Sequence, residues 1–99
     1  MNFEWDEQKN ELNIDKHGFD FADAYQVFDL PMVVDLDERR DYGEDRWIGI
    51  GLLDKRDVVV VFTEPNKETT RIISLRKALS KALSYERRRY EQYLKNRLV

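Results

Sequence analysis

The chain has 99 residues, of which 41% are hydrophobic and 12% aromatic, which suits one folded core and argues against a disordered chain. It contains no cysteine, so disulfide frameworks, thiolate nucleophiles and cysteine-based zinc sites are excluded. The net charge of −3 is unevenly divided, because residues 1–46 carry 5 Lys/Arg against 14 Asp/Glu and residues 47–99 carry 12 Lys/Arg against 6 Asp/Glu.

The N-terminal part of the chain predicts one short strand and two helices. Residues 3–5 suit a strand, and Asp6 is a favourable N-cap for a helix that runs to about Lys16, with Gly18 as the residue that ends it. Asp20 can cap a second helix, whose apolar residues recur at a spacing that predicts a core-facing stripe: Phe21, Ala24, Tyr25 and Phe28. The acidic N-terminus does not look like a signal peptide, and no apolar run has the length of a membrane span, so we expect a cytoplasmic protein.

The middle of the chain predicts four strands, joined mostly by hairpin turns: residues 32–36, 46–53, 58–62 and 70–75. The run of residues 58–62 is β-branched or aromatic throughout, which is typical of a strand with both faces covered. The charged loop at residues 37–45 has Gly43 as its turn residue. Gly49 and Gly51 fall on one face of their strand and leave room for a helix or a ligand to pack close.

The last predicted strand ends in two cations, Arg76 and Lys77, and such a strand end can hold a phosphate. Because side chains alternate along a strand, Arg71 and Arg76 start on opposite faces unless a bulge intervenes. From Ala78 onward the pattern is helical. Residues 1–99 therefore predict a single two-layer α+β domain, with a short N-terminal strand and two helices, a four-stranded and mostly antiparallel sheet, and a C-terminal helix.

Several classes of enzyme lack their motifs in this chain. The single histidine, His17, is accompanied neither by the pattern G-x-S-x-G of a nucleophile elbow nor by the spaced partners of a metal site. The pair Gly49 and Gly51 does not extend into a phosphate loop or a dinucleotide fingerprint. We therefore expect no cofactor and no metal, and phosphodiester chemistry without a metal ion remains.

Such chemistry needs cations to stabilise the charge that develops on the phosphorus, groups that move protons, and rings on which unpaired bases can stack. The candidate cations are Arg46, Arg71, Arg76 and Lys77. The candidate proton-transfer groups are His17, Glu44 and Glu64. The candidate rings are Trp5, Tyr42 and Trp47.

These candidates also have structural interpretations. His17 beside Gly18 can be an ordinary helix-end residue, and Trp5 can anchor the core. Glu44 and Arg46 can pair with each other at the surface. The basic second half of the chain can meet nucleic acid, or it can simply complement the acidic first half.

Several blocks of residues, spread over nearly the whole chain, together carry a family resemblance. The N-terminal blocks are Phe3-Glu4-Trp5-Asp6, Lys9, Asn13, Lys16-His17-Gly18-Phe19, and the spaced set Phe21, Ala24, Val27, Phe28 and Asp29. The later blocks are Asp41-Tyr42-Gly43-Glu44, Arg46, Gly51, Arg71-Ile72-Ile73-Ser74, Arg76-Lys77-Ala78 and Glu86-Arg87-Arg88-Arg89-Tyr90-Glu91. In this order the blocks resemble the BrnT family, but the link at residues 78–84 is longer than usual, and the acidic net charge is unusual for an RNA-binding enzyme.

The resemblance implies a toxin of a bacterial type II toxin–antitoxin pair, with a RelE-like ribonuclease fold and metal-independent RNA cleavage that inhibits translation. It implies a BrnA-like antitoxin with a ribbon-helix-helix part, through which the pair binds operator DNA. Carried onto this sequence, the residues implied for catalysis are Arg76, Arg71, Arg46, His17 and Glu44, without a division into general base and general acid. Those implied for RNA binding are Trp5, Lys16 and Lys77. The alternatives are a non-catalytic module that binds a ribbon-helix-helix partner and modulates operator repression, and a toxin that has lost cleavage.

Overall fold

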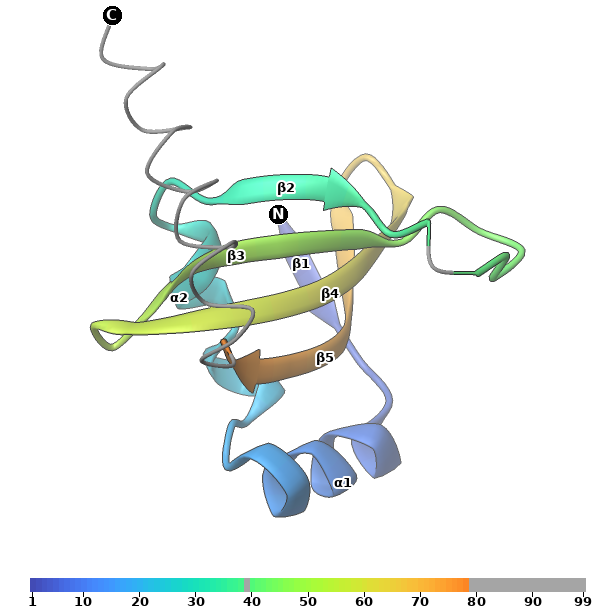
Figure 1. Ribbon diagram of the computed structural model, residues 1–99. Coiled ribbons are helices and arrows are strands. Elements are labelled where there is room, and N and C mark those ends of the chain that lie inside the picture. Colours follow the sequence, from blue (N-terminus) through green and yellow to red (C-terminus); the bar gives the residue numbers. More distant parts are fainter. Residues whose placement is uncertain (39, 79–99) are drawn as a thin grey trace, which may run out of the picture.

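The computed structural model describes residues 1–38 and 40–78, which form a curved five-stranded sheet with helices packed against it (Figure 1). The strands are β1 (Asn2–Glu4), β2 (Val33–Leu36), β3 (Trp47–Leu53), β4 (Arg56–Asn66) and β5 (Thr69–Lys77). The helical segments are α1 (Glu7–His17), the 3-10 turn η1 (Phe21–Asp23) and α2 (Tyr25–Phe28). The predicted α+β class is confirmed, and the four strands predicted for residues 32–75 are all present.

The strands lie in the order β1-β5-β4-β3-β2, with β1 parallel to β5 and the other neighbours antiparallel. The prediction of a four-stranded sheet is therefore wrong, since β1 joins as a fifth strand by pairing Asn2 with Thr69 and Glu4 with Arg71. A strand of three residues carries too little pattern to reveal its partner, and a parallel partner needs a long connection. The predicted C-terminal helix lies outside the described residues.

Helix α1 begins and ends where the sequence predicts. The Asp6 side chain accepts a hydrogen bond of 3.1 Å from a backbone N–H of the first turn. Gly18 ends the helix with a φ of 76°, and its N–H donates to the Ile14 carbonyl at 2.8 Å. Only glycine adopts this left-handed conformation without steric cost, so the stop is sharp. Lys16 and His17 are thereby held in the last turn of α1.

The predicted second helix is interrupted. Asp20 caps it as expected and accepts hydrogen bonds of 2.9 Å from the Asn10 side chain and from a backbone N–H two residues later. However, the first turn is η1, and α2 follows only after Ala24. A 3-10 turn has about three residues per turn instead of 3.6, so the apolar stripe changes phase. Val27 is consequently buried, whereas Tyr25, predicted to face the core, is 49% exposed.

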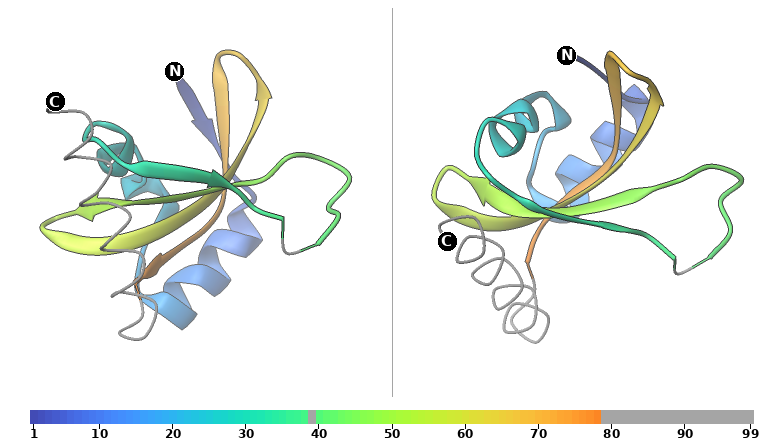
Figure 2. Two further views of the ribbon diagram at one scale, coloured as in Figure 1. Left: turned by 45° about the horizontal axis from the view of Figure 1, so that its top comes forward. Right: turned by 90° about the horizontal axis from the view of Figure 1, so that it is seen from above.

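The main core lies on the face of the sheet that η1 and α2 cover, which we call the core face (Figure 2). Its buried residues are Phe19, Phe21, Ala24, Val27, Leu53, Val58, Val60, Phe62, Ile72 and Leu75. The other side, which we call the outer face, carries a smaller cluster of Ile50, Val59 and Ala78, with Ile48 against it. Residues 58–61 are all buried, which confirms the predicted strand with both faces covered.

The two glycines of β3 allow the chain to pack closely on itself. A methyl group added at Gly49 would lie 2.9 Å from the Met32 sulfur atom. One added at Gly51 would lie 3.0 Å from Val27 Cγ1 of α2. Of the two predicted occupants of this space, the helix is therefore the one found, together with the segment that follows it.

Candidate active site

A β-bulge in β5 brings two arginines onto the same face of the sheet. The pairing of β4 with β5 shifts register at Ile73, which is the extra residue of the bulge. Ile72 and Leu75 both face the core although they are three residues apart. Arg71 and Arg76 therefore both lie on the outer face, in contrast to simple alternation along the strand.

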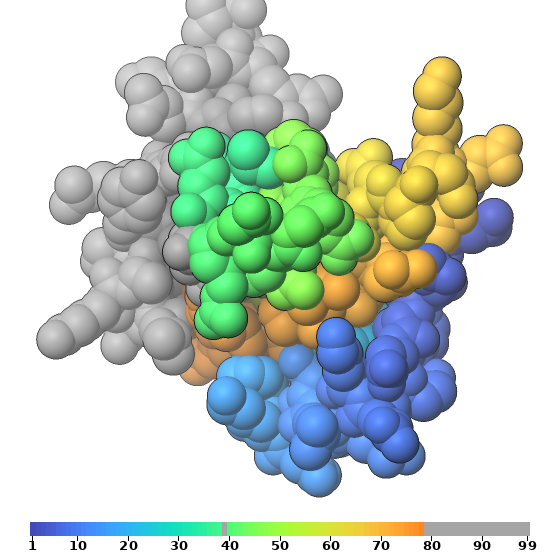
Figure 3. All heavy atoms as spheres, turned by 90° about the vertical axis from the view of Figure 1, so that its right-hand side faces the viewer, coloured from blue at the N-terminus to red at the C-terminus, as the bar shows by residue number. Residues whose placement is uncertain are grey.

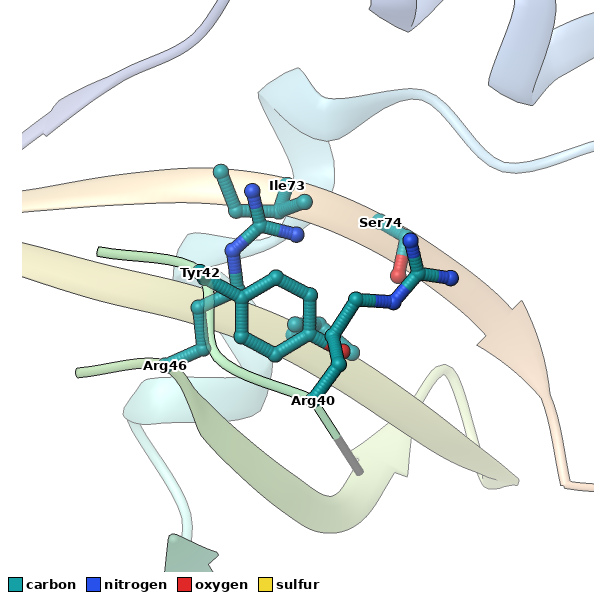
Figure 4. A pocket seen from close by; sticks show the side chains of 6 residues that line it. Arg40, Tyr42, Arg46, Ile73 and Ser74 are labelled. Carbon is teal, nitrogen blue, oxygen red and sulfur yellow. The ribbon is translucent and has the colours of Figure 1, made fainter. Parts of the chain in front are cut away.

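The outer face has a cavity of about 430 Å³ against the loop that precedes β3 (Figure 4). We call it the arginine cavity, and its lining residues are Arg40, Tyr42, Arg46, Val61, Ile73 and Ser74. The guanidinium carbon of Arg46 lies 4.1 Å from the centre of the Tyr42 ring, and that of Arg40 lies 5.7 Å from it. The guanidinium groups of Arg40 and Arg46 thus both lie close to the Tyr42 ring.

The arginine cavity is electrostatically suited to an anion. Among the described residues, its lining contains two guanidinium groups and the hydroxyl-bearing Tyr42 and Ser74, but no carboxylate. The Nε atom of Arg46 is buried and has no hydrogen-bond partner among the described residues. A partly desolvated cation without a carboxylate partner attracts phosphate more strongly than one that is already paired in water.

A second hollow, of about 200 Å³, lies between α1 and β5. We call it the histidine hollow, and its lining residues are Lys9, Leu12, Asn13, Lys16, His17 and Ile73. The bulge residue Ile73 is common to both hollows, which therefore adjoin each other across β5. In Figure 3, β5 (orange) runs between the loop before β3 (green) and α1 (blue). We call the two hollows together the basic groove.

His17 has the electrostatic surroundings of a proton acceptor. Burial lowers its pKa below the ordinary value of 6.5, and the positive charges of Lys16 and Arg76 lower it further. The imidazole is therefore mainly neutral at pH 7, which is the form that can take up a proton. Arg76 is half-buried close to this hollow and donates from Nη1 to the Lys77 carbonyl at 3.3 Å. Lys77 is exposed at the end of β5.

Two of the candidate residues are engaged in contacts with their own chain. Arg71 forms an ion pair with Glu4 across β1 and β5, with its Nη2 at 2.9 Å and its Nε at 3.0 Å from the same carboxylate oxygen. Trp5 packs against the core, and its indole N–H donates to Glu7 at 2.7 Å. The Trp5 contacts agree with its structural interpretation as a core anchor. Both side chains lie outside the lining of the basic groove.

Glu44 lines a different hollow, of about 460 Å³, on another side of the same loop. The remaining residues of that lining are Asp45, Trp47, Thr63, Glu64 and Pro65. Its three carboxylates would repel a phosphate. The structure therefore brings Arg46 together with Arg40 and Tyr42, and Lys16 together with His17, but it separates Glu44 from both groups.

Sequence reasoning missed three residues that the structure gathers at the groove. Arg40 lies in an irregular loop, where no periodicity predicts a direction, and Ser74 faces the cavity only because of the bulge. Asn13 belongs to a motif of the family resemblance, but its position on an otherwise polar helix gave no sign that it is buried.

Among residues 1–38 and 40–78, no three His, Cys, Asp or Glu side chains are grouped so that they could hold a metal ion. None of the helices in this part of the chain is long and apolar enough to cross a membrane.

Comparison with known proteins identifies one family. The model of the family described as the ribonuclease toxin BrnT of type II toxin–antitoxin systems matches residues 5–81. Among solved structures, the chain is similar to the ribonuclease toxin BrnT of Brucella abortus, with a TM-score of 0.68 and 34% sequence identity. That similarity covers 81% of this chain and 99% of the Brucella chain. A search of curated proteins gave no match.

Proposed function

The chain belongs to the BrnT family of ribonuclease toxins of type II toxin–antitoxin systems, and we propose that it cleaves RNA in the basic groove without a metal ion. The observation that carries this proposal is the meeting of two cation-lined hollows at Ile73, in which none of the described lining residues is a carboxylate. An RNA backbone laid along the groove would place successive phosphates near Arg46 and near Lys16. The acidic hollow around Glu44 would not compete for it.

The roles follow from charge and position. Arg46 holds a phosphate in the arginine cavity, and Arg76, with Lys16, offsets the negative charge that develops at the scissile phosphate next to His17. Neutral His17 takes the proton from a ribose 2′-hydroxyl, whose oxygen then attacks the adjacent phosphorus. The bond to the 5′-oxygen breaks, and that oxygen takes a proton, for which Lys16 is the candidate donor. The products are a 2′,3′-cyclic phosphate and a 5′-hydroxyl end.

The other expected residues have supporting roles in this proposal. Arg71 ties β1 to β5 through Glu4 and shapes the sheet under the groove. Lys77, exposed at the end of β5, adds positive charge for the RNA backbone. Trp5 anchors the start of α1. Glu44 is not needed for the proton transfer that we assign to His17.

We further propose the biological setting that the family implies. Cleavage of RNA in the cytoplasm would inhibit translation, and a BrnA-like antitoxin with a ribbon-helix-helix part would neutralise the toxin. The pair would bind operator DNA through the antitoxin. An antitoxin that covers the basic groove would have to present acidic side chains to it, since the part of the lining that the structure describes carries several cations and no carboxylate.

A non-catalytic module that binds a ribbon-helix-helix partner is the second candidate function. The acidic hollow around Glu44 favours it, because a surface with three carboxylates suits a basic protein segment better than it suits RNA.

An assay of RNA cleavage in the presence of EDTA distinguishes the two functions. Purified chain is incubated with ribosomal and messenger RNA, with and without the product of the neighbouring reading frame. Cleavage in EDTA that the neighbouring product suppresses would support the toxin. Intact RNA with a folded, partner-free chain, both on free RNA and on ribosomes, would contradict it.

A further inference from the structure

Three contacts connect Asp37, Tyr42 and Arg46 in a closed cycle beside the arginine cavity. The Asp37 backbone N–H donates to the Arg46 carbonyl at 2.7 Å. The Tyr42 hydroxyl donates to the Asp37 carboxylate at 3.1 Å. The Arg46 guanidinium returns over the Tyr42 ring, 4.1 Å from its centre. Asp37 is only 5% exposed, so this cycle of contacts is anchored in the interior of the protein.

This arrangement restricts a side chain that would otherwise be mobile. A free arginine loses considerable rotamer entropy when it binds a ligand in one orientation. Here the aromatic face of Tyr42 attracts the guanidinium, because the centre-to-cation distance is well within the range of about 6 Å for such contacts. The guanidinium edge keeps N–H groups for phosphate oxygens, since stacking uses the face of the group.

The geometry points to Tyr42 as a positioning residue. We propose that its ring holds the Arg46 guanidinium in the orientation that binds an RNA phosphate, and that the Asp37 carboxylate holds the ring in turn. Tyr42 thus acts on the substrate through Arg46. This inference depends on the proposed role of Arg46 in the basic groove.

A direct role of Tyr42 is the competing explanation. Tyr42 is half-buried and lines the cavity, so a base could stack on it without the help of Arg46. The two explanations differ in one respect. If Tyr42 positions Arg46, its substitution has no effect once Arg46 is gone, whereas a base-stacking ring contributes in either background.

The test is a double-mutant cycle with an RNA that cannot be cleaved. The variants are Tyr42→Phe and Tyr42→Leu, each in the parent chain and in Arg46→Met. Affinity is measured for a 2′-O-methyl oligoribonucleotide, kcat and KM are measured for cleavable RNA, and folding is checked by thermal unfolding. Tyr42→Leu should weaken binding about tenfold in the parent chain and less than about twofold in Arg46→Met. Tyr42→Phe keeps the ring and should lie between the parent chain and Tyr42→Leu.

Several results would overturn the inference. Equal losses of affinity on Tyr42→Leu with and without Arg46 would show that Tyr42 acts on its own. Equal effects of Phe and Leu at this position would show that the Tyr42 hydroxyl, and not the ring over Arg46, carries the contribution. If the Leu variant does not fold, the interaction of Tyr42→Phe with Arg46→Met decides whether Tyr42 acts through Arg46. A parent chain that binds the oligonucleotide without cleaving RNA would defeat the proposed ribonuclease but leave the cycle valid. A parent chain that binds no RNA would defeat both.

Discussion

The Asn13 side chain forms the hydrogen bonds to the Leu75 backbone that a neighbouring strand would otherwise form. Its amide nitrogen donates to the Leu75 carbonyl at 2.8 Å, and its oxygen accepts from the Leu75 N–H at 3.2 Å. The same nitrogen donates to the Phe19 carbonyl at 2.9 Å. Strand β1 pairs only with residues 69–71 of β5, so this part of the β5 edge would otherwise lack partners. One buried carboxamide therefore fixes α1, with His17 at its end, against the strand that carries Arg76.

Asn13→Ala should reduce the free energy of unfolding by about 3 kcal/mol, because it leaves buried backbone groups of Leu75 and Phe19 without hydrogen bonds. Urea unfolding of the purified chain measures this. Glu11→Ala, at an exposed position of the same helix, is the matched control and should change stability by less than about 0.5 kcal/mol. Equal stability of the two variants would show that the Asn13 contacts contribute little.

Gly51→Ala should destabilise the protein by about 1–3 kcal/mol, because the added methyl would meet Val27 Cγ1 at 3.0 Å and Met32 Cβ at 3.1 Å. The same substitution in a Val27→Ala background should cost less, since one of the two obstructing groups is removed. Thermal unfolding of the parent chain, the two single variants and the double variant measures both costs. A cost that is the same in both backgrounds would mean that α2 does not restrict this position.

The imidazole of His17 should titrate below pH 6.5 in the folded chain, because burial and then the charges of Lys16 and Arg76 disfavour its protonated form. Its contribution to stability is therefore fully present above the unfolded pKa of about 6.5 and decreases as the pH falls toward the lower, folded pKa. If His17 is the general base, kcat/KM should fall on the acid side of the same folded pKa.

NMR titration measures this pKa without ambiguity, because the sequence contains one histidine. Lys16→Met and Arg76→Met should each raise the pKa, and Lys16→Met should raise it more. Lys55→Met, in the turn between β3 and β4, serves as a control for the loss of one positive charge. A folded pKa at or above 6.5, or no response to either of the two substitutions, would contradict the environment described for His17.

The local elements of this fold could be predicted because their signals lie within a few residues. Asp6 and Gly18 mark the ends of α1, and the apolar run that begins at Val58 marks the central strand. The fifth strand could not be predicted, because three residues carry no register. The phase change after η1, which exposes Tyr25, depends on a turn type that the apolar spacing does not encode.

The candidate site was predictable in its chemistry more than in its geometry. The cations at Arg46 and Arg76 and the single imidazole were evident from composition and from the family resemblance. The bulge at Ile73 determines which side chains of β5 lie on the same face of the sheet, and no pattern in the sequence predicts the bulge. The pairing of Arg71 with Glu4 follows from the position of β1, which the sequence did not reveal. Tertiary contacts therefore distinguish Arg46, which lines the arginine cavity, from Arg71, which is paired with Glu4, although the sequence offered both as candidate cations.

Substitutions of Arg46 and Arg71 test whether RNA is cleaved in the basic groove without a metal ion, with Arg46 holding a phosphate there. The measurement is the initial rate of RNA cleavage in EDTA by the parent chain, Arg46→Met and Arg71→Met, at equal concentrations of folded protein. Arg46→Met should lose about 100-fold, because a cation at the phosphate is removed. Arg71→Met should stay within about threefold of the parent chain and lose at most about 1 kcal/mol of stability, because its partner is an exposed Glu4. A large loss for Arg71→Met, with Arg46→Met as active as the parent chain, would contradict the account.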